Sequence, residues 1–441
     1  MKTNIKRRYR AEIWDIMQYI FASSFDHQIH FLIKFDSFID IGRLKKTVNL
    51  LIIEFPLIGC RFLESRNHPF WEEAGFRAED IVFFQKTQNI NEEIQKAFGP
   101  KIDEFNDPQL RIHIIRSMKE DTLCININHM LCDGEGYRDI IYRLSSIYSH
   151  PDTQLEMHTE TDNETHIETQ SGHKVGNNIM GIDMGCRNAW QVLQPFNIKD
   201  KIKILFNRYD LKKNEMTTTY DLEGDINTPF LVYHTITQAK FKMIKNYAKS
   251  KGASINDVLL TAYIRTLYKH LNMQVPAIQC VVNLRKYITK KEAVGFCNLT
   301  STLMCNIGDH IGDGFEGTLK TVKKVMDEEK GKLNCLNLIM KLEIVYRILP
   351  YQIFKRKVLE SNCFPPLAMS NIGIIDKERL VFGEMKVTNA FITGSIKYKP
   401  LIQLSLSTYD NRITFSFGFH GTHSDQQKLT ELLEEFEKEL P

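Results

Sequence analysis

The segment with the most chemical potential is at residues 127–134, which read Ile-Asn-His-Met-Leu-Cys-Asp-Gly. It places His129 at the end of an apolar run, and Asp133 four residues later, directly before Gly134. An imidazole has an unperturbed pKa that suits proton transfer near neutral pH, so His129 is a candidate general base. Across a tight turn the Asp133 carboxylate need not point at the imidazole and can instead pair with a distant arginine. Gly134 allows a backbone conformation or a close approach that a side chain would block.

The same segment also fits a plain structural interpretation, a strand end followed by an Asp-Gly turn. Other patterns in the chain point more weakly to chemistry. We expect His420 and His423 to be surface residues rather than a second base. Four histidines within residues 150–178 are spaced by seven or eight positions, which fits no usual ligand pattern, so no metal site is predicted. Residues 312–317 match G-x-G-x-x-G, but two carboxylates inside that turn would repel a pyrophosphate.

The surrounding elements must deliver His129 to the end of a strand. Residues 123–128 alternate in polarity, which predicts a strand, and residues 110–116 are expected to form a hairpin with it. Apolar residues at helical spacing predict a helix over 136–148. The other predicted elements are helices at 41–55, 253–271, 317–330 and from 424 onwards, and strands at 58–63, 277–284, 299–307, 401–408 and 412–419. Each half therefore predicts helices packed on a mixed or mostly antiparallel sheet, an α+β fold.

A change of composition divides the chain. Within residues 150–178 Glu, Thr, Asp, His and Asn dominate and apolar residues are few, so this stretch can bury little surface. We expect it to be a polar mobile loop or linker. The predicted N-terminal lobe covers residues 1–185 and carries His129, and the predicted C-terminal lobe covers residues 186–441.

The segment at 127–134 resembles the HHxxxDG signature of the chloramphenicol-acetyltransferase-like acyltransferase superfamily. That superfamily includes peptide-synthetase condensation domains and alcohol acyltransferases. Further matches follow in the same order between about residues 10 and 435. They are the apolar helix and strand at 41–62, an N-D-x-x-L-x-A helix at 256–262, an N-x-R strand end at 283–285, the segment Val-Gly-Phe-Cys-Asn at 294–298, and S-N-x-G at 370–373.

The resemblance implies two similar lobes with a tunnel between them, which admits donor and acceptor from opposite faces. It implies that His129 is the general base, and that Asp133 is mainly structural and pairs with an arginine. Arg285 is the candidate for that arginine, because it matches the N-x-R element. An acyl transfer also needs a donor to the oxyanion, and Ser370, Asn371 and the Gly134 amide are candidates.

Two of these assignments keep a plainer alternative. Ser370 and Asn371 also fit a turn that closes a strand. Cys132 occupies one of the three variable positions of the signature, where no nucleophile is needed, and we assign it no role.

The chain departs from the family pattern at Asn128, which stands where the first histidine of HHxxxDG is expected. This weakens the match to condensation domains. The D-F-G-W-G element of the plant branch is absent, and its nearest counterpart is Ser-Phe-Gly-Phe at 416–419. A free-standing, bacterial-type acyltransferase is therefore the closer resemblance.

Composition limits the classes of partner. The 441 residues include 57 Lys and Arg against 54 Asp and Glu, a net charge of +3, which argues against nucleic acid as a partner. The nine cysteines are scattered, which is typical of free thiols in a reducing compartment. No secretory signal and no apolar run long enough for a transmembrane segment occur, so we expect a cytoplasmic protein.

These observations predict an acyltransferase that moves an acyl group from a thioester to an alcohol or amine acceptor. No permanently bound cofactor is expected, and acyl-CoA or a phosphopantetheine thioester would be the co-substrate. One alternative is a free-standing condensation-type enzyme whose acyl donor is bound to a carrier protein. Another is a non-catalytic binding relative, which the change at Asn128 suggests.

Overall fold

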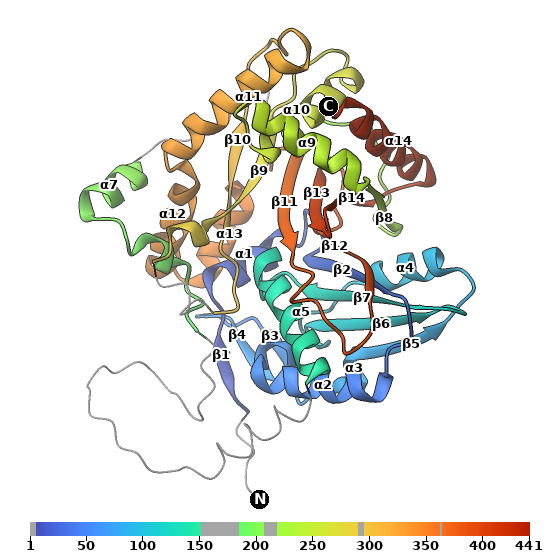
Figure 1. Ribbon diagram of the computed structural model, residues 1–441. Coiled ribbons are helices and arrows are strands. Elements are labelled where there is room, and N and C mark those ends of the chain that lie inside the picture. The colour runs from blue at the N-terminus through green and yellow to red at the C-terminus, as the bar shows by residue number, and fades with distance from the viewer. Residues whose placement is uncertain (1–5, 151–184, 207–217, 290–294, 362–363) are drawn as a thin grey trace, which may run out of the picture.

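The computed structural model describes residues 6–150, 185–206, 218–289, 295–361 and 364–441. The predicted polar loop at 150–178 lies outside these ranges from residue 151 onwards. Two large sheets and one small sheet organise the described residues, and the two large ones lie one above the other in Figure 1. Helices pack on both large sheets, which confirms the predicted α+β class.

The lower sheet in Figure 1 carries the His129 segment. Its five strands, in spatial order, are β12 (Val387–Thr393), β2 (Gln28–Phe35), β7 (Asp121–Asn128), β6 (Leu110–Arg116) and β5 (Val82–Lys86). All neighbours are antiparallel except β5 and β6, and the predicted hairpin of β6 with β7 is confirmed.

Helices cover both faces of this sheet. Helix α5 (Gly134–Ser149) packs with α2 (Ile41–Glu54) and α3 (Ala78–Ile81) on one face, and α4 (Ile90–Phe98) packs on the other. Leu123, Ile125 and Ile127 of β7 contact the first group, whereas Cys124 packs against α4. The period of two in β7 therefore sends alternate side chains into two separate cores.

The upper sheet has six strands. In spatial order they are β10 (Thr300–Cys305), β9 (Ile278–Asn283), β11 (Leu367–Ile375), β13 (Ile402–Tyr409), β14 (Arg412–His420) and β8 (Pro229–Thr235). Strand β11 runs parallel to both of its neighbours, and the other pairs are antiparallel. The helices of this half are α9 (Gln238–Ser250), α10 (Ile255–His270), α11 (Gly314–Gly331), α12 (Asn334–Ile348) and α14 (His423–Glu439).

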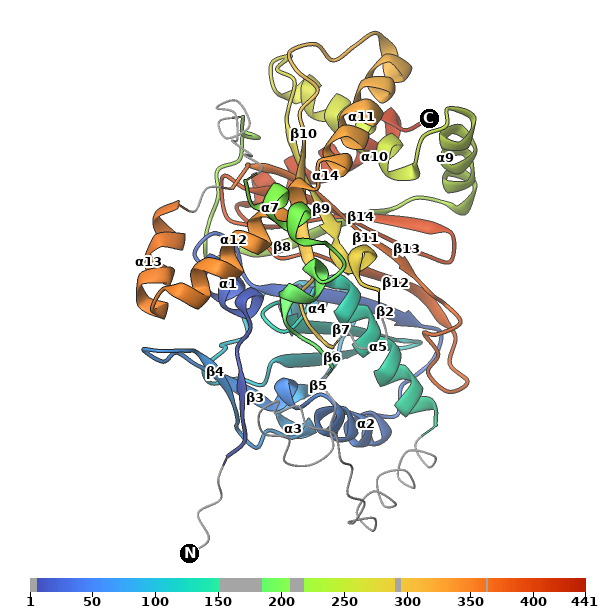
Figure 2. The ribbon, with the colours of Figure 1, turned by 90° about the vertical axis from the view of Figure 1, so that its left-hand side faces the viewer.

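The remaining elements lie beside these two layers. A small sheet has the order β1 (Arg8–Arg10), β4 (Phe70–Glu73), β3 (Cys60–Leu63). The predicted strand at 58–63 is therefore shorter, because a single 3-10 turn at Pro56–Gly59 precedes it. Helix α1 (Ile13–Phe21) lies beside α12 and α13 (Tyr351–Ser361), as Figure 2 shows, and α7 (Ile198–Phe206) packs on α12.

Local sequence explains several of these boundaries. Helix α10 begins with a capping box, in which the Asp257 N–H donates to Ser254 Oγ at 3.1 Å and the Ser254 N–H donates to Asp257 Oδ2 at 2.9 Å. The hairpin of β13 and β14 turns at Asp410 and Asn411, whose φ values are 44° and 56°. Asp and Asn tolerate this left-handed conformation, which two-residue hairpin turns require.

One strand joins the two halves of the chain. Strand β12 lies between β11 and β13 in sequence, yet it pairs with β2 and completes the lower sheet. At its end the Ile392 N–H donates to Ser407 Oγ on β13 at 3.0 Å, which ties it back to the upper sheet. The predicted division of the chain at 185/186 stays a prediction, but the lower sheet takes one strand from beyond it. No helix in the described ranges is both long and apolar enough to cross a membrane.

Candidate active site

His129 follows the last residue of β7 and begins a tight turn into α5. Its backbone N–H donates to the His27 carbonyl at 2.6 Å, and the Leu131 N–H donates to the Asn128 carbonyl at 3.0 Å. Asp133 ends the turn as the N-cap of α5, where its Oδ1 accepts the Gly136 N–H at 3.0 Å. The order strand, turn, helix predicted for this segment is therefore present.

Asp133 is also one half of a buried ion pair between sequence-distant segments. Its Oδ2 lies 2.7 Å from Arg285 Nη1 and accepts the Leu299 N–H at 2.7 Å. Arg285 Nη2 donates to the Cys297 carbonyl at 3.0 Å. Burial alone would raise the pKa of the Asp133 carboxyl, but the Arg285 charge and the backbone N–H groups outweigh it and hold that pKa below its usual value. The pairing implied by the resemblance exists, and it anchors the turn to the second half of the chain.

Gly134 is required by close packing. A Cβ atom at this position would lie 2.7 Å from Ile372 Cγ2 on β11, closer than two carbon atoms pack. The start of α5 thus approaches β11 at a distance that only glycine allows.

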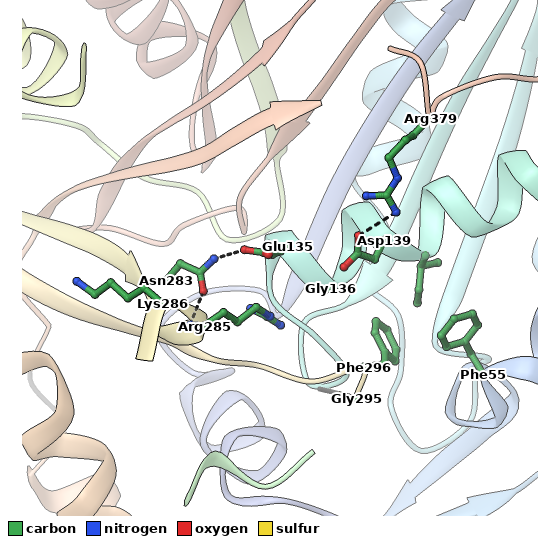
Figure 3. A pocket seen from close by; sticks show the side chains of 11 residues that line it. Phe55, Glu135, Gly136, Asp139, Asn283, Arg285, Lys286, Gly295, Phe296 and Arg379 are labelled. Atoms are coloured by element: carbon green, nitrogen blue, oxygen red, sulfur yellow. Dashed lines mark hydrogen bonds and ion pairs between the residues drawn. The ribbon is translucent and has the colours of Figure 1, made fainter. Parts of the chain in front are cut away.

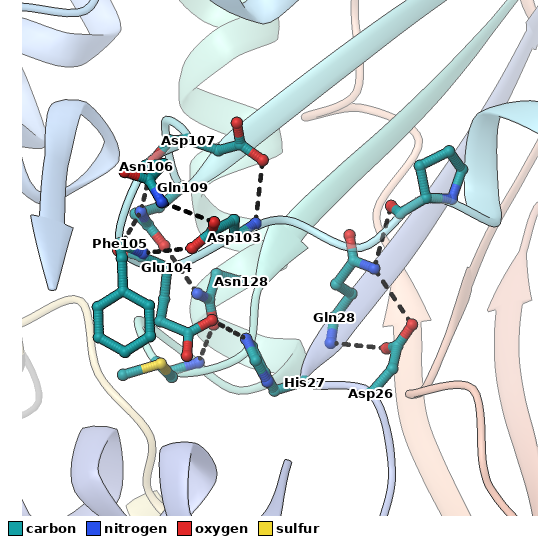
Figure 4. Close-up of polar contacts among 12 residues, drawn as sticks. Asp26, His27, Gln28, Asp103, Glu104, Phe105, Asn106, Asp107, Gln109 and Asn128 are labelled. Atoms are coloured by element: carbon teal, nitrogen blue, oxygen red, sulfur yellow. Dashed lines mark hydrogen bonds and ion pairs between the residues drawn. The ribbon is translucent and has the colours of Figure 1, made fainter. Parts of the chain in front are cut away.

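Asn128 faces away from the cavity that His129 lines. Its Nδ2 donates to Gln109 Oε1 at 2.7 Å and its Oδ1 accepts the Met130 N–H at 2.9 Å, while His27 lies nearby against Glu104 (Figure 4). The side chain is fully buried and its amide is satisfied on both sides. The departure from the HHxxxDG signature therefore changes the support of the turn and not the lining of the cavity.

A cavity of about 760 Å³ opens beside His129. Residues of both large sheets line it. All the predicted site residues are among them: His129, Asp133, Gly134, Arg285, Ser370 and Asn371. Residues separated by up to 242 positions in the chain (129 to 371) thus meet at one place. Analysis of the sequence missed several polar lining residues, of which Gln279, Thr302, Lys397 and Gln403 carry no motif that could have revealed them.

A second cavity of about 680 Å³ adjoins the first. The two share Glu135, Asn283 and Arg285 in their linings. Figure 3 shows Glu135 directed at Asn283, and Asp139 paired with Arg379 at 3.6 Å. The two cavities therefore adjoin each other near Arg285.

The environment of His129 favours the neutral imidazole. Burial lowers the pKa of His129, the nearby Lys397 charge lowers it further, and the Asp133 charge opposes both without reversing them. The enclosed ring nitrogen is Nδ1, so Nε2 is the nitrogen that faces the cavity. A neutral imidazole with an accessible nitrogen can accept a proton, which is the requirement for a general base.

Asn298 supports the turn from the opposite segment. Its Nδ2 donates to the His129 carbonyl at 2.8 Å and to the Met130 carbonyl at 3.2 Å. Its Oδ1 and His129 Nδ1 are both buried without a hydrogen-bond partner among the described residues. Asn298 thus holds the backbone of His129 in place, a role that the sequence match at 294–298 did not identify.

The two candidate oxyanion donors differ. The Asn371 side chain is engaged, because its Oδ1 accepts the Gly373 N–H at 3.1 Å and its Nδ2 donates to Asn256 Oδ1 at 3.3 Å. The Asn371 side chain closes a bulge in β11 between Asn371 and Gly373. The sequence also allowed a turn that closes a strand here, and the structure has a bulge within the strand instead. The Ser370 hydroxyl, buried beside the cavity, makes no hydrogen bond within the described ranges. Of the two side chains, only that of Ser370 is free of hydrogen bonds to other described residues.

The expectation for His420 was wrong, and that for His423 is confirmed. His420 is only 3% exposed, because its ring stacks on Tyr398 with centroids 4.4 Å apart. His423, at the start of α14, is exposed. Burial raises the pKa of the Cys132 thiol, consistent with an inert side chain. No cluster of metal-ligating side chains occurs among residues that the structure describes.

Comparisons with known proteins identify the fold. No family model matches the sequence, and no curated protein matches it. Among solved structures, the first condensation domain of the calcium-dependent antibiotic synthetase is similar with a TM-score of 0.65 and 12% identity, covering 98% of this chain and 95% of that one. The trichothecene 15-O-acetyltransferase from Fusarium sporotrichioides is similar with a TM-score of 0.63 and 12% identity, over 99% of this chain and 96% of that one.

Polyketide synthase associated protein 5 from Mycobacterium tuberculosis gives a TM-score of 0.58 and 14% identity, over 98% and 97% of the two chains. At such identities the likeness concerns the fold alone. The chain therefore shares its two-lobed fold with this condensation domain and this acetyltransferase, which confirms the predicted fold.

Proposed function

We propose that this protein is an acyltransferase that moves an acyl group from a thioester to an alcohol or amine, with His129 as the general base. The observation that carries the proposal is the convergence of His129, Ser370 and the Asp133–Arg285 pair on one cavity. The likeness of the fold to condensation domains and to an acetyltransferase supports the same reaction class.

The reaction follows from this arrangement. His129 Nε2 takes the proton from the acceptor O–H or N–H while the acceptor atom attacks the thioester carbonyl. The Ser370 hydroxyl donates to the oxygen that becomes negative. When the tetrahedral intermediate collapses, the C–S bond breaks, the new ester or amide remains, and the imidazolium returns its proton to the leaving thiolate. Asp133 takes no proton in these steps, because its carboxylate holds the turn through Arg285.

The acyl donor is either acyl-CoA or a phosphopantetheine thioester on a carrier protein. Coenzyme A is the donor we favour, because the chain lacks the full HHxxxDG signature of condensation domains. Carrier-bound donors are the second candidate, and the condensation domains among the similar structures favour them. In both cases the thioester is a co-substrate and not a resident cofactor.

Thiol release tests the proposal directly. Purified protein is incubated with acetyl-, butyryl- and palmitoyl-CoA and a pool of alcohols and amines, and then with acyl-loaded carrier proteins. We expect release that depends on the acceptor and is lost in His129→Ala, while the exposed His423→Ala retains it. Release that is equal in wild type and His129→Ala would refute the assignment of the base. Silence with every donor would leave the non-catalytic binding relative as the better description.

A further inference from the structure

Lys397 is a buried cation that lines the same cavity as His129. Lys397 is only 8% exposed. Its ammonium group makes neither a hydrogen bond nor an ion pair with any residue that the structure describes. Its Nζ lies 3.9 Å from the centroid of the Phe25 ring. An ammonium group has three N–H donors, and an aromatic face satisfies none of them fully.

The position of Lys397 is set by its backbone. The Lys397 N–H donates to the Gly418 carbonyl at 2.9 Å, and the His420 N–H donates to the Lys397 carbonyl at 2.9 Å. Lys397 also forms an isolated antiparallel β-bridge with Phe25. Lys397 is thus held by backbone contacts between the end of β14 and the segment that follows α1.

The acidic groups nearby do not neutralise it by contact. Asp26 attracts the Lys397 charge, but its carboxylate accepts the Gln28 N–H at 3.0 Å and Gln28 Nε2 at 3.1 Å, and it makes no ion pair with Lys397 within 4 Å. The two carboxylates of the cavity lining are engaged as well, Asp133 with Arg285 and Glu135 with Asn283. Among the described residues, no carboxylate is therefore in contact with the Lys397 ammonium.

An aromatic cluster adjoins this charge. The rings of Phe21 and Phe25 both pack on Phe364, with centroids 4.7 Å and 5.6 Å apart. All three side chains line the cavity. A ligand that fills this region would meet an apolar wall and, at its edge, the ammonium group of Lys397.

We propose that the cavity recognises a substrate carrying a carboxylate, which pairs with Lys397 while the apolar body of the substrate packs on the cluster of Phe21, Phe25 and Phe364. A buried charge is costly without a partner, and a carboxylate supplies both the opposite charge and the acceptors that the ammonium lacks. The inference rests on the proposed function, since the ligand would be the acyl acceptor or the acyl chain itself. Lys397 does not take part in the covalent step.

Binding measurements without turnover test this specificity. Isothermal titration compares 3-phenylpropanoate with 3-phenylpropanamide, a pair that probes a carboxylate on the acceptor. A second comparison, of glutaryl-CoA with pentanoyl-CoA, probes a carboxylate on the acyl chain. We expect at least one acid to bind the wild type tenfold or more tightly than its neutral counterpart, and Lys397→Met to lose that preference.

The variants provide the controls. Lys397→Arg should keep the preference, and Lys397→Gln serves as a second uncharged variant if Lys397→Met folds poorly. Lys101→Met is the matched control, because Lys101 also lies over an aromatic ring, that of Tyr398 at 4.8 Å, but is exposed and outside the cavity lining.

The proposal is overturned if the wild type prefers neither acid, or if the preference survives in both uncharged variants. The titrations measure binding and need no acyl transfer. A failure of the proposed function in the thiol-release assay therefore does not prevent a measurement of the preference for acids. Conversely, transfer without any preference for acids would overturn this inference and leave the proposed function standing.

Discussion

The ion pair of Asp133 and Arg285 should be among the costliest contacts in the molecule to break from one side. The side chains are 2% and 11% exposed, and the pair joins the turn after β7 to the segment after β9. Removing one partner of a buried pair leaves an uncompensated charge, which costs about 3–5 kcal/mol. We therefore expect Asp133→Asn and Arg285→Met each to lower the free energy of unfolding by an amount in that range.

A double-mutant cycle distinguishes the pair from its surroundings. Asp133→Asn preserves shape and can still accept one of the N–H groups of Gly136 and Leu299, so the change is mainly one of charge. In the double variant no charge is left buried, and we expect it to be less destabilised than the sum of the single variants by about 1–3 kcal/mol. Urea unfolding followed by tryptophan fluorescence measures all four proteins.

The matched control is Asp139→Asn, on the same helix. Asp139 pairs with Arg379 at 3.6 Å, and both side chains are 57% exposed, so water screens the pair. The expected change is below about 1 kcal/mol. Single variants of the buried pair that match this control, or a double variant whose loss equals the sum of the singles, would refute the reasoning.

The same pair predicts a pH dependence with a definite sign. The folded-state pKa of Asp133 lies below its unfolded value, so its contribution is fully present above the unfolded pKa of about 4 and is lost as the pH falls through the folded value. The stability difference between wild type and Asp133→Asn should therefore be constant at neutral pH and shrink only in acid. A difference that shrinks between pH 6 and 8 would contradict this assignment.

Further predictions concern the turn and the cavity. Gly134→Ala should destabilise the fold by about 1–3 kcal/mol, because its Cβ would lie 2.7 Å from Ile372 Cγ2, and thermal melting measures this. Transfer activity should rise with pH through an apparent pKa below 6.5 and then stay level, since burial lowers the pKa of His129; a rise centred above pH 7 would contradict it. Ser370→Ala should lower kcat by about 100-fold with little change in KM, as expected for loss of one oxyanion donor. Asn298→Leu should lower kcat, and it should also lower the melting temperature because the turn loses a supporting hydrogen bond. An unchanged kcat would contradict a role for Asn298 in positioning His129.

The turn around His129 was predictable because its determinants are local. Alternating polarity over 123–128 and Asp133 at an N-cap are properties of a few adjacent residues, whereas the close approach at Gly134 is to Ile372 on the distant strand β11. The capping box at Ser254 was predictable for the same reason. Such patterns act within one turn or one strand, where the separation of two residues along the chain determines how their side chains are placed relative to each other.

The composition of the sheets was not predictable in this way. Strand β2 is buried over seven of its eight positions, so it shows no alternation that would mark it as half-exposed, and its place between β7 and β12 depends on pairing. Strand β12 pairs with β2 across more than 350 positions of the chain, and only the packed structure shows which of the two sheets it joins. Non-local pairing of this kind is determined by the whole fold.

The sequence by itself determined the strand, turn and helix around residues 127–134 and the class of the fold, because both depend on short-range patterns. The tertiary structure alone decided which side chains are enclosed. Lys397 and His420 are polar residues that sequence favours at a surface, yet contacts with Phe25 and Tyr398 bury them. Burial depends on what distant segments place over a residue, and that is why the specificity inferred for the cavity became visible only in the folded chain.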